Sequence, residues 1–244
     1  MSVHNTSSMS TSSKSYTRYW EVPRYYNEEN NINIPICKEI RAVLYRRGII
    51  NSSQIEEFIN PKLIHDPTSH FEDLKKAIDR IGEACKKGYP IAICGDYDAD
   101  GMTSTALLTN VLSRLGATVI PIIPDRLTEG YGLNISIVNK LKLQNINLLI
   151  TVDNGVSSID ALRLAKQYGI DVVLSDHHSI NKELPEIFAI IHPQLTPQNS
   201  QFRSLAGVGL AYIIGSELLK SFGLHQETSI ALDLFCIGTI ADVS

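Results

Sequence analysis

Three aspartates lie at alternate positions of the stretch 95–101, which reads Gly-Asp-Tyr-Asp-Ala-Asp-Gly. They are Asp96, Asp98 and Asp100, and the stretch follows directly on the apolar run 91–94, which has the composition of a buried strand. Carboxylates at this spacing repel one another strongly unless cations lie among them. The stretch therefore predicts a divalent metal site at the end of a strand.

Two further polar clusters also follow apolar runs. An Asp-Asn-Gly turn at 153–155 comes after the run 148–152, and an Asp-His-His triplet at 176–178 comes after the run 172–175. In a parallel α/β sheet the carboxyl ends of the strands form one edge, where ligand sites gather. All three clusters are therefore expected to meet at that edge.

The residue types favour a particular kind of metal. The adjacent imidazoles of His177 and His178 offer nitrogen ligands, and together with carboxylates they indicate Mn²⁺, or Mg²⁺ with a poorer fit, rather than Ca²⁺. With Asp153 at the same edge, one carboxylate could bridge two ions roughly 3.5–4 Å apart, as two-metal phosphoryl-transfer sites require. A pair of ions at this edge is therefore predicted.

Each cluster also has a simpler interpretation. One acid of the first cluster could cap a helix that begins near Thr103, the turn 153–155 could be an ordinary strand-to-helix turn capped by a serine, and the triplet 176–178 could be a solvated loop. Only one of three alternating acids can cap a helix, however, and the others would remain as clustered like charges. The shared edge of the sheet therefore favours metal binding.

The apolar periodicity predicts the elements that must position these clusters. Strands are predicted at 91–94, 118–123, 148–152, 172–175 and 189–192, and helices at 71–87, 103–115, 135–143, 158–168, 207–222 and 230–240. Strands and helices that alternate with short connections are typical of a mostly parallel sheet with helices on both faces. The predicted fold class is therefore α/β.

The residues that precede this domain are predicted to form a separate N-terminal region. Residues 1–30 are predicted to be a disordered tail, because the first nineteen are rich in Ser and Thr and lack the apolar core of a secretory signal. An organellar transit peptide is the alternative for that tail. Residues 31–70 are predicted to form a small helical segment with helices at 36–47 and 53–59, and residues 71–244 to form the main domain.

Composition argues against several classes of protein. The chain has 244 residues, 43% of them apolar, and no run near the roughly 18 apolar residues that a membrane span needs, so a membrane protein is not expected. The four cysteines form no Cys-x-x-Cys pair, which argues against a zinc knuckle or a disulfide framework and favours a reducing, cytoplasmic setting. The net charge of −4 argues against scanning of duplex DNA more than against metal-dependent phosphate chemistry.

Two loops are candidates for substrate contacts. Gly207 and Gly209 precede an apolar helix and could present backbone N–H groups to a phosphate, although paired glycines also serve close packing. Arg126 lies in a polar loop after the second predicted strand, at the same edge of the sheet. Its guanidinium could hold a phosphate or could simply neutralise the acids.

Taken together, these motifs resemble the DHH phosphoesterase superfamily, which is named for the Asp-His-His found here at 176–178. The first motif of its nuclease members, Gly-Asp-(Tyr/Phe)-Asp-Ala-Asp-Gly, is unbroken here and is followed by Thr-Ser-Thr. The likeness covers roughly residues 71–243. Seven motifs occur in the order of the family, at 95–101, 103–105, 126–132, 153–155, 176–178, 207–209 and 238–243.

The resemblance implies a role for each acid and imidazole. The ligands of the two Mn²⁺ or Mg²⁺ ions would be Asp98, Asp100, Asp153, His177 and Asp242, with Asp96 among them or directly beside them. The ions would activate a water molecule and polarise a phosphodiester for in-line attack, without a covalent enzyme intermediate. Because the His178 imidazole could contact the scissile phosphate, the catalytic residues would be Asp98, Asp153, His177 and His178.

The activity that the resemblance implies is stepwise 5′-to-3′ removal of nucleotides from single-stranded DNA, in recombination and repair. Single-stranded DNA is therefore the expected substrate, and a single-strand-binding protein or a helicase is an expected partner. Some relatives carry a histidine near Cys94, and the nuclease members continue into a second domain that grips DNA and is absent from these 244 residues. The chain is therefore expected to be the front part of a longer protein.

Two other functions remain open. A DHH phosphodiesterase could act on short oligonucleotides or cyclic dinucleotides, and a comparison of long single strands with dinucleotides as substrates would separate it from an exonuclease. A non-catalytic replication scaffold with a degenerate DHH domain would typically lack some motif acids. This chain keeps all of them, which favours an enzyme.

Overall fold

The structure, a computed structural model, describes residues 36–60, 66–180 and 184–243. The chain divides into two compact units, Met1–Ile64 and His65–Ser244. Among the described residues, no helix is long and apolar enough to cross a membrane. The tail predicted at 1–30 lies outside the described residues.

The first unit contains two short helices, α1 (Lys38–Arg46) and α2 (Ser52–Ile59). Each helix buries one apolar side chain, Leu44 in α1 and Ile55 in α2, and these side chains pack in a small cluster. Asn51 caps α2, because its side chain accepts a hydrogen bond from an N–H in the first turn. Both helices lie where the apolar spacing predicts them.

The second unit is built around a five-stranded parallel sheet with the strand order β2-β1-β3-β4-β5. The strands are β1 (Ile91–Cys94), β2 (Val119–Ile122), β3 (Leu148–Val152), β4 (Asp171–Ser175) and β5 (Ala189–Ile191). The neighbours β1, β3 and β4 are the strands that precede the polar clusters, so these clusters begin side by side. The prediction of an α/β fold with a parallel sheet is confirmed.

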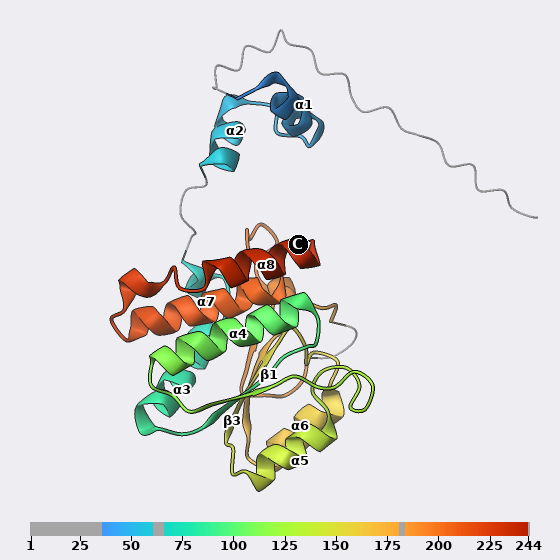
Figure 1. Cartoon of the computed structure of the whole chain (residues 1–244), viewed down its shortest axis with the longest axis vertical. Coiled ribbons are helices and arrows are strands. Elements are labelled where there is room, and N and C mark those ends of the chain that lie inside the picture. Colours follow the sequence, from blue (N-terminus) through green and yellow to red (C-terminus); the bar gives the residue numbers. More distant parts are fainter. Residues whose placement is uncertain (1–35, 61–65, 181–183, 244) are drawn as a thin grey trace, which may run out of the picture. The chain divides into compact units, whose positions relative to one another are not determined.

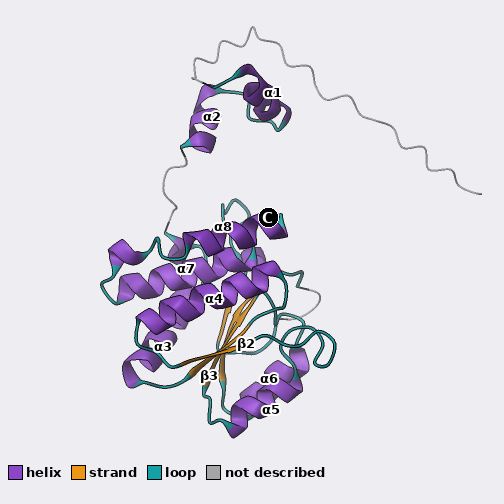
Figure 2. Cartoon of the chain, viewed as in Figure 1, coloured by secondary structure: helices purple, strands orange, loops and turns teal. Residues whose placement is uncertain are grey.

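Helices cover both faces of the sheet in Figure 1, and the strands run between the two helical layers in Figure 2. One layer contains α5 (Ile135–Leu143) and α6 (Ile159–Gln167). The other contains α3 (Leu74–Lys87), α4 (Ala99–Arg114) and α7 (Gly207–Ser221), and α8 (Leu232–Asp242) packs on α4 and α7. Short 3₁₀ helices lie at η1 (Pro67–Ser69), η2 (Pro193–Leu195) and η3 (His225–Glu227).

Burial of both faces of the sheet explains why the strand sequences are continuous apolar runs. In β1, Ile91 and Ile93 face the cluster shared with α3, α4 and α7, whereas Ala92 and Cys94 face the cluster shared with α5 and α6. These side chains are fully buried, because successive residues of a strand point to opposite faces and both faces carry helices. Burial on both faces holds the end of β1, and with it the acidic stretch, in a fixed place.

The helix after the acidic stretch begins earlier than the sequence predicts. It starts at Ala99 rather than near Thr103, and Asp98 is its N-cap, with a carboxylate oxygen that accepts a 2.9 Å hydrogen bond from the Gly101 N–H. Asp and Gly are weak helix formers, which hides this first turn in the sequence. An N-cap aspartate and a second acid in the first turn nevertheless suit the positive end of a helix dipole. Asp98 and Asp100 are therefore held by the start of α4.

Candidate metal centre

The acidic stretch after β1 is compact because glycines let its backbone fold tightly. A Cβ on Gly101 would lie 2.5 Å from the Asp96 nitrogen, and a Cβ on Gly95 would overlap the Thr105 hydroxyl. Asp96 is consequently 2% exposed, and Oδ1 of its carboxylate has no hydrogen-bond partner. Burial raises the pKa of Asp96, because the charged form loses its solvation.

Asp100 joins the start of α4 to the start of α7. Its two carboxylate oxygens accept hydrogen bonds of 2.7 Å each, one from the Gly207 N–H and one from the Val208 N–H. Burial raises the pKa of Asp100, while these hydrogen bonds favour its charged form. The carboxylate therefore serves as the anion at the N-terminus of α7.

Asp153 lies in a strained turn directly after β3. Its φ angle is 59°, in the left-handed region that residues other than glycine rarely adopt. Asn154 holds this turn, because its side-chain NH₂ group donates to the carbonyl oxygens of Cys94 at 3.0 Å and Val152 at 2.8 Å. Backbone strain of this kind persists only where the surroundings impose it, and it clusters at functional sites.

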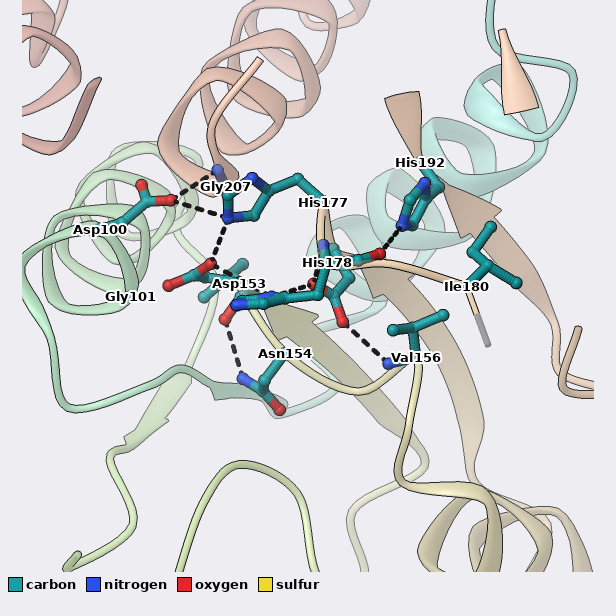
Figure 3. A network of polar contacts seen from close by, with 12 residues as sticks. Asp100, Gly101, Asp153, Asn154, Val156, His177, His178, Ile180, His192 and Gly207 are labelled. Carbon is teal, nitrogen blue, oxygen red and sulfur yellow. Dashed lines mark hydrogen bonds and ion pairs between the residues drawn. The ribbon is translucent and has the colours of Figure 1, made fainter. Parts of the chain in front are cut away.

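The Asp153 carboxylate is poorly satisfied within the protein. The residue is 1% exposed, and neither carboxylate oxygen has a hydrogen bond of acceptable geometry. Its Oδ1 lies at ion-pair distance, 3.0 Å, from Nε2 of His177 (Figure 3). Burial, followed by the nearby charges of Asp100 and Asp98, raises the pKa of Asp153 to about 7. A bound cation would stabilise such a buried anion.

His177 lies among the carboxylates of three aspartates. Besides the contact with Asp153, its Nε2 is 3.6 Å from Asp100 Oδ2, and its Nδ1 is 3.9 Å from Asp242 Oδ2. Burial alone would lower the pKa of His177, but the neighbouring Asp153 outweighs burial and raises it. The imidazole therefore links acids that come from the start of α4, the end of β3 and the last turn of α8.

His178 is held by Asp176, the acid directly after β4. Asp176 Oδ1 accepts from the His178 N–H at 3.0 Å and from the ring Nδ1 at 2.8 Å, and Oδ2 accepts from the Val156 N–H at 2.9 Å. The ring hydrogen bond raises the pKa of His178 to about 9. Burial alone would raise the pKa of Asp176, but the hydrogen bonds from His178 and Val156 lower it. Asp176 is thus a positioning residue, a role that the sequence did not assign to it although the triplet itself was singled out.

Tyr131 is another site residue that the sequence did not single out. Its hydroxyl lies 3.3 Å from the carbonyl oxygen of Asp153 and 3.3 Å from Nε2 of His178. Burial, and then the surrounding acids, raise the pKa of this hydroxyl, so it remains a proton donor. Its ring meets the Tyr97 ring edge-on, and the Arg126 guanidinium lies 5.0 Å from the centre of the Tyr97 ring. An aromatic residue between two glycines in a polar loop is the signal that marks Tyr131 in the sequence.

The structure differs from the prediction that Gly207 and Gly209 offer N–H groups to a phosphate. The Gly207 N–H is bound to Asp100, and the Gly209 N–H donates to the Ala206 carbonyl at 3.0 Å. Gly207 instead permits a close approach, because a Cβ at this position would lie 2.7 Å from the Asp153 Cβ. The alternative interpretation, close packing, therefore accounts for these glycines.

The structure brings the predicted ligands together. Three groups of donor atoms each lie within 4.8 Å of one another: Asp96, Asp98 and Asp153; Asp100, His177 and Asp242; and Asp153, His177 and His178. The buried oxygens Asp96 Oδ1 and Asp153 Oδ2 have no hydrogen-bond partner, and Asp153 Oδ1 has only ion-pair contacts with the two histidines, so a cation would supply the partners that buried polar atoms normally have. Carboxylates combined with imidazole form a donor set that suits Mn²⁺ and, less well, Mg²⁺. The residues present therefore fit such ions.

A glycine in α8 controls the position of Asp242. A Cβ on Gly238 would overlap the Thr103 hydroxyl and would lie 2.8 Å from Val208 Cγ1. Gly238→Ala should therefore push α8 away from α4 and α7 and lower the free energy of unfolding by about 1–3 kcal/mol. Because Asp242 would move with α8, Mn²⁺ should also bind more weakly. Urea denaturation in chelator and a titration with Mn²⁺ measure the two effects.

Gly82→Ala in α3 is the matched control for Gly238→Ala. A Cβ on Gly82 would meet Phe222 at 3.5 Å, which is ordinary van der Waals contact. This variant should keep the Mn²⁺ affinity of the wild type and should not lose stability, because alanine is the better helix former. Equal Mn²⁺ affinities of the two alanine variants would show that Gly238 does not position Asp242.

Comparisons with known proteins identify relatives of this chain. A family model described as "DHH family, N-terminal domain" matches residues 90–239. The single-stranded-DNA-specific exonuclease RecJ of Bacillus subtilis (strain 168) is 39% identical over an alignment of 229 residues, which covers 92% of this chain and 28% of that protein.

Solved structures show the same similarity. The crystal structure of RecJ in complex with Mn²⁺ from Thermus thermophilus is 32% identical, with a TM-score of 0.68, over 84% of this chain and 28% of that chain. The corresponding complex with Mg²⁺ is 29% identical, with a TM-score of 0.55, over 84% of this chain and 24% of that chain. The chain thus spans less than a third of the length of each of these proteins.

Proposed function

This chain belongs to the DHH family, and on that premise we propose that it hydrolyses phosphodiester bonds with the help of two Mn²⁺ or Mg²⁺ ions. We further propose that its substrate is single-stranded DNA, from which it removes nucleotides stepwise in the 5′-to-3′ direction during recombination and repair. The observation that carries the proposal is the buried Asp153 carboxylate, which is shared by two groups of possible ligand atoms and lacks hydrogen bonds. The match to the Bacillus subtilis exonuclease covers 28% of that protein, so the proposal rests on this site.

Each part of the site would have a distinct task. The residues that bind the ions would be Asp96, Asp98, Asp100, Asp153, His177 and Asp242. When bound, such ions lower the pKa of water and polarise a phosphodiester. The His178 ring, kept protonated by its hydrogen bond to Asp176, would donate a hydrogen bond to the scissile phosphate. Asp176 would hold that ring in place.

The loop around Arg126 supports a nucleic acid as the substrate. Its guanidinium lies 5.0 Å from the centre of the Tyr97 ring, and Tyr131 is 48% exposed beside Tyr97 and His178. Aromatic rings next to a positive charge suit a strand whose bases stack while its phosphates meet the cation. We therefore propose that Arg126 binds a phosphate and that the two tyrosines contact a base beside the ions.

A phosphodiesterase for short oligonucleotides or cyclic dinucleotides is the second candidate. Its support is the charge of the chain, in which 22 Lys and Arg stand against 26 Asp and Glu. Nonspecific strand binders instead rely on a basic groove lined with aromatic side chains.

A non-catalytic scaffold is not favoured, because all motif acids are present. Contact with a single-strand-binding protein or a helicase is a further proposal that rests on the family alone.

Weak, distributive cleavage of long single strands is the expected result for this chain. Because acidic residues outnumber basic ones in the chain, affinity should rise little as 5′-labelled single strands become longer. Mn²⁺ should support more activity than Mg²⁺, because the site includes imidazole ligands. A titration with labelled strands of increasing length, with product analysis at each length, measures these effects.

The controls of this titration decide between the candidates. EDTA should abolish hydrolysis and added Mn²⁺ should restore it, and release of mononucleotides from the labelled 5′ end would identify an exonuclease. Faster hydrolysis of dinucleotides than of any longer strand would identify the second candidate. Affinity that climbs steeply with length and falls steeply with salt would show that these 244 residues already contain a basic groove. Hydrolysis that persists in EDTA would contradict the proposed function.

A further inference from the structure

His192 is a buried histidine outside the ligand set, and it contacts the Asp-His-His loop. It follows β5 directly and is 0% exposed. Its Nε2 lies 2.8 Å from the carbonyl oxygen of His178 (Figure 3), and its Nδ1 accepts a 3.1 Å hydrogen bond from the Gln194 N–H. The ring therefore connects η2 to the loop that follows β4.

The two partners of the His192 ring determine its tautomer. A carbonyl oxygen can only accept, so Nε2 must carry the proton, and a backbone N–H can only donate, so Nδ1 must be unprotonated. Both nitrogens of a neutral imidazole are thus used in full. Burial lowers the pKa of His192, which favours the same neutral form.

The Asp-His-His loop needs a tie of this kind. The last main-chain hydrogen bond between the triplet and β5 is at Asp176, whose N–H donates to the Ile191 carbonyl at 3.3 Å, and the His178 N–H returns to Asp176 within the loop itself. The segment after β5 reaches the loop at two points: His192 binds the His178 carbonyl, and the Gln194 side chain accepts a longer, 3.5 Å hydrogen bond from the Ile180 N–H. The shorter of these ties is the one made by His192.

We infer that His192 is a positioning residue for the metal centre: it fixes the main chain at His178 and thereby the directions of the His177 and His178 rings. The inference rests on the proposed function in assigning those rings to metal and phosphate. The ring centres are 4.7 Å apart, and Asp153 Oδ1 is 3.0 Å from a nitrogen of His177 and 3.8 Å from a nitrogen of His178. A displaced main chain would therefore move both rings away from Asp153.

Variants of His192 separate its two bonds. His192→Asn keeps an acceptor where Nδ1 stood, and asparagine is a good N-cap for η2, but the shorter side chain cannot reach the His178 carbonyl. His192→Phe keeps the ring and loses both bonds. The matched control is Thr196→Val, which removes a buried 2.6 Å hydrogen bond from the Thr196 hydroxyl to the Pro193 carbonyl next to His192. That control leaves the bond to His178 in place.

Mn²⁺ affinity is the first readout, from the electron paramagnetic resonance signal of free Mn²⁺. His192→Asn and His192→Phe should each weaken Mn²⁺ binding by about 10- to 100-fold, the usual loss when a group that orients the ligands is removed, and hydrolysis should fall with it. Thr196→Val should bind Mn²⁺ as the wild type does. In chelator, the melting temperatures of His192→Asn and Thr196→Val should fall by similar amounts, because each variant loses one buried hydrogen bond.

NMR of the metal-free protein, recorded in chelator, is the second readout, and it depends on neither bound metal nor activity. Long-range ¹H–¹⁵N spectra should show the His192 proton on Nε2. His192→Asn should shift the ring signals of His177 and His178, whereas Thr196→Val should leave them unchanged.

Several results would overturn the role of His192. These are a proton on Nδ1, ring signals of His177 and His178 that do not move in His192→Asn, or wild-type Mn²⁺ affinity in both His192 variants. A wild-type chain that binds no Mn²⁺ would contradict the proposed function instead. The NMR result alone would then decide whether His192 positions the loop.

Discussion

Replacing Asp153 with asparagine is expected to abolish hydrolysis and, at the same time, to stabilise the metal-free protein. Bound metal ions contribute several kcal/mol to the transition state, so loss of the shared ligand should lower activity in Mn²⁺ by at least about 1,000-fold. In chelator, the substitution removes a buried carboxylate whose pKa is raised and whose oxygens accept no hydrogen bond of good geometry. The free energy of unfolding should therefore rise by about 1–3 kcal/mol at pH 8.

The pH dependence of this stabilisation follows from the pKa of Asp153. In the folded protein the pKa is about 7, above the ordinary 3.8, so ionisation of Asp153 destabilises the folded state. The penalty is absent below about pH 4, grows between about pH 4 and 7, and is complete above that range. The advantage of Asp153→Asn should therefore be largest above pH 7 and should disappear towards pH 4. Urea denaturation in chelator across this range measures it.

Asparagine is the suitable replacement because of the backbone at Asp153. The φ angle of 59° lies in the left-handed region, which asparagine tolerates as aspartate does, whereas alanine loses about 1–2 kcal/mol there. Asp153→Ala should therefore be equally inactive but less stable than Asp153→Asn. Activity above a few per cent in Mn²⁺ would show that Asp153 is not a bridging ligand. A less stable Asp153→Asn above pH 7 would contradict the raised pKa.

The same substitution at Asp100 is expected to act on stability in the opposite direction. The Asp100 carboxylate accepts 2.7 Å hydrogen bonds from the N–H groups of Gly207 and Val208. An asparagine oxygen can accept one of these bonds, but its NH₂ group would then face the other N–H donor. Burial raises the pKa of Asp100 as well, but at this position the loss of the buried charge also removes the acceptor of two backbone N–H groups at the start of α7. The second effect should dominate and lower the free energy of unfolding by about 2–4 kcal/mol. Urea denaturation in chelator measures this loss, and hydrolysis should disappear with the ligand.

Asp98→Asn is the matched control for Asp100→Asn, because both acids belong to the same motif. Asp98 makes one 2.9 Å hydrogen bond, to the Gly101 N–H at the start of α4, and asparagine caps a helix about as well as aspartate. Its stability in chelator should therefore stay within about 0.5 kcal/mol of the wild type, while its activity in Mn²⁺ falls. Equal stability of the two asparagine variants would show that Asp100 does not hold α7.

The convergence of the metal ligands could be predicted from the sequence because it depends on local patterns and one general rule. Asp96, Asp153 and His177 each stand just after an apolar run, and parallel strands end at the same edge of a sheet. The structure adds that β1, β3 and β4 are neighbours, so no strand separates the polar clusters. Like-charge repulsion then identifies the chemistry, because it depends only on residue type and spacing.

Other roles could not be predicted, because they depend on contacts between distant segments. The Gly207 N–H binds Asp100, which lies 107 residues earlier, and a local pattern cannot distinguish a glycine that donates to a phosphate from one that donates to a carboxylate. His192 likewise reads as an ordinary residue until the fold brings it to His178, and the glycines that flank Tyr131 do not reveal its contact with the same histidine. The early start of α4 could not be predicted for a local reason. Its first turn contains the weak helix formers Asp100 and Gly101, and the cap at Asp98 outweighs their low helix propensity.

The position of Asp242 in the last turn of α8 has a consequence for synthesis of the protein. The segment with Asp96 leaves the ribosome well before Asp242 does, so the ligand set cannot assemble on a partial chain. Contacts between segments so far apart belong to the late stages of folding. A metal ion held by Asp100, His177 and Asp242 would join the start of α4 to the last turn of α8 at that late stage. Such an ion would need the last helix of the domain, whereas the group of Asp96, Asp98 and Asp153 is already complete on a chain that ends before α8.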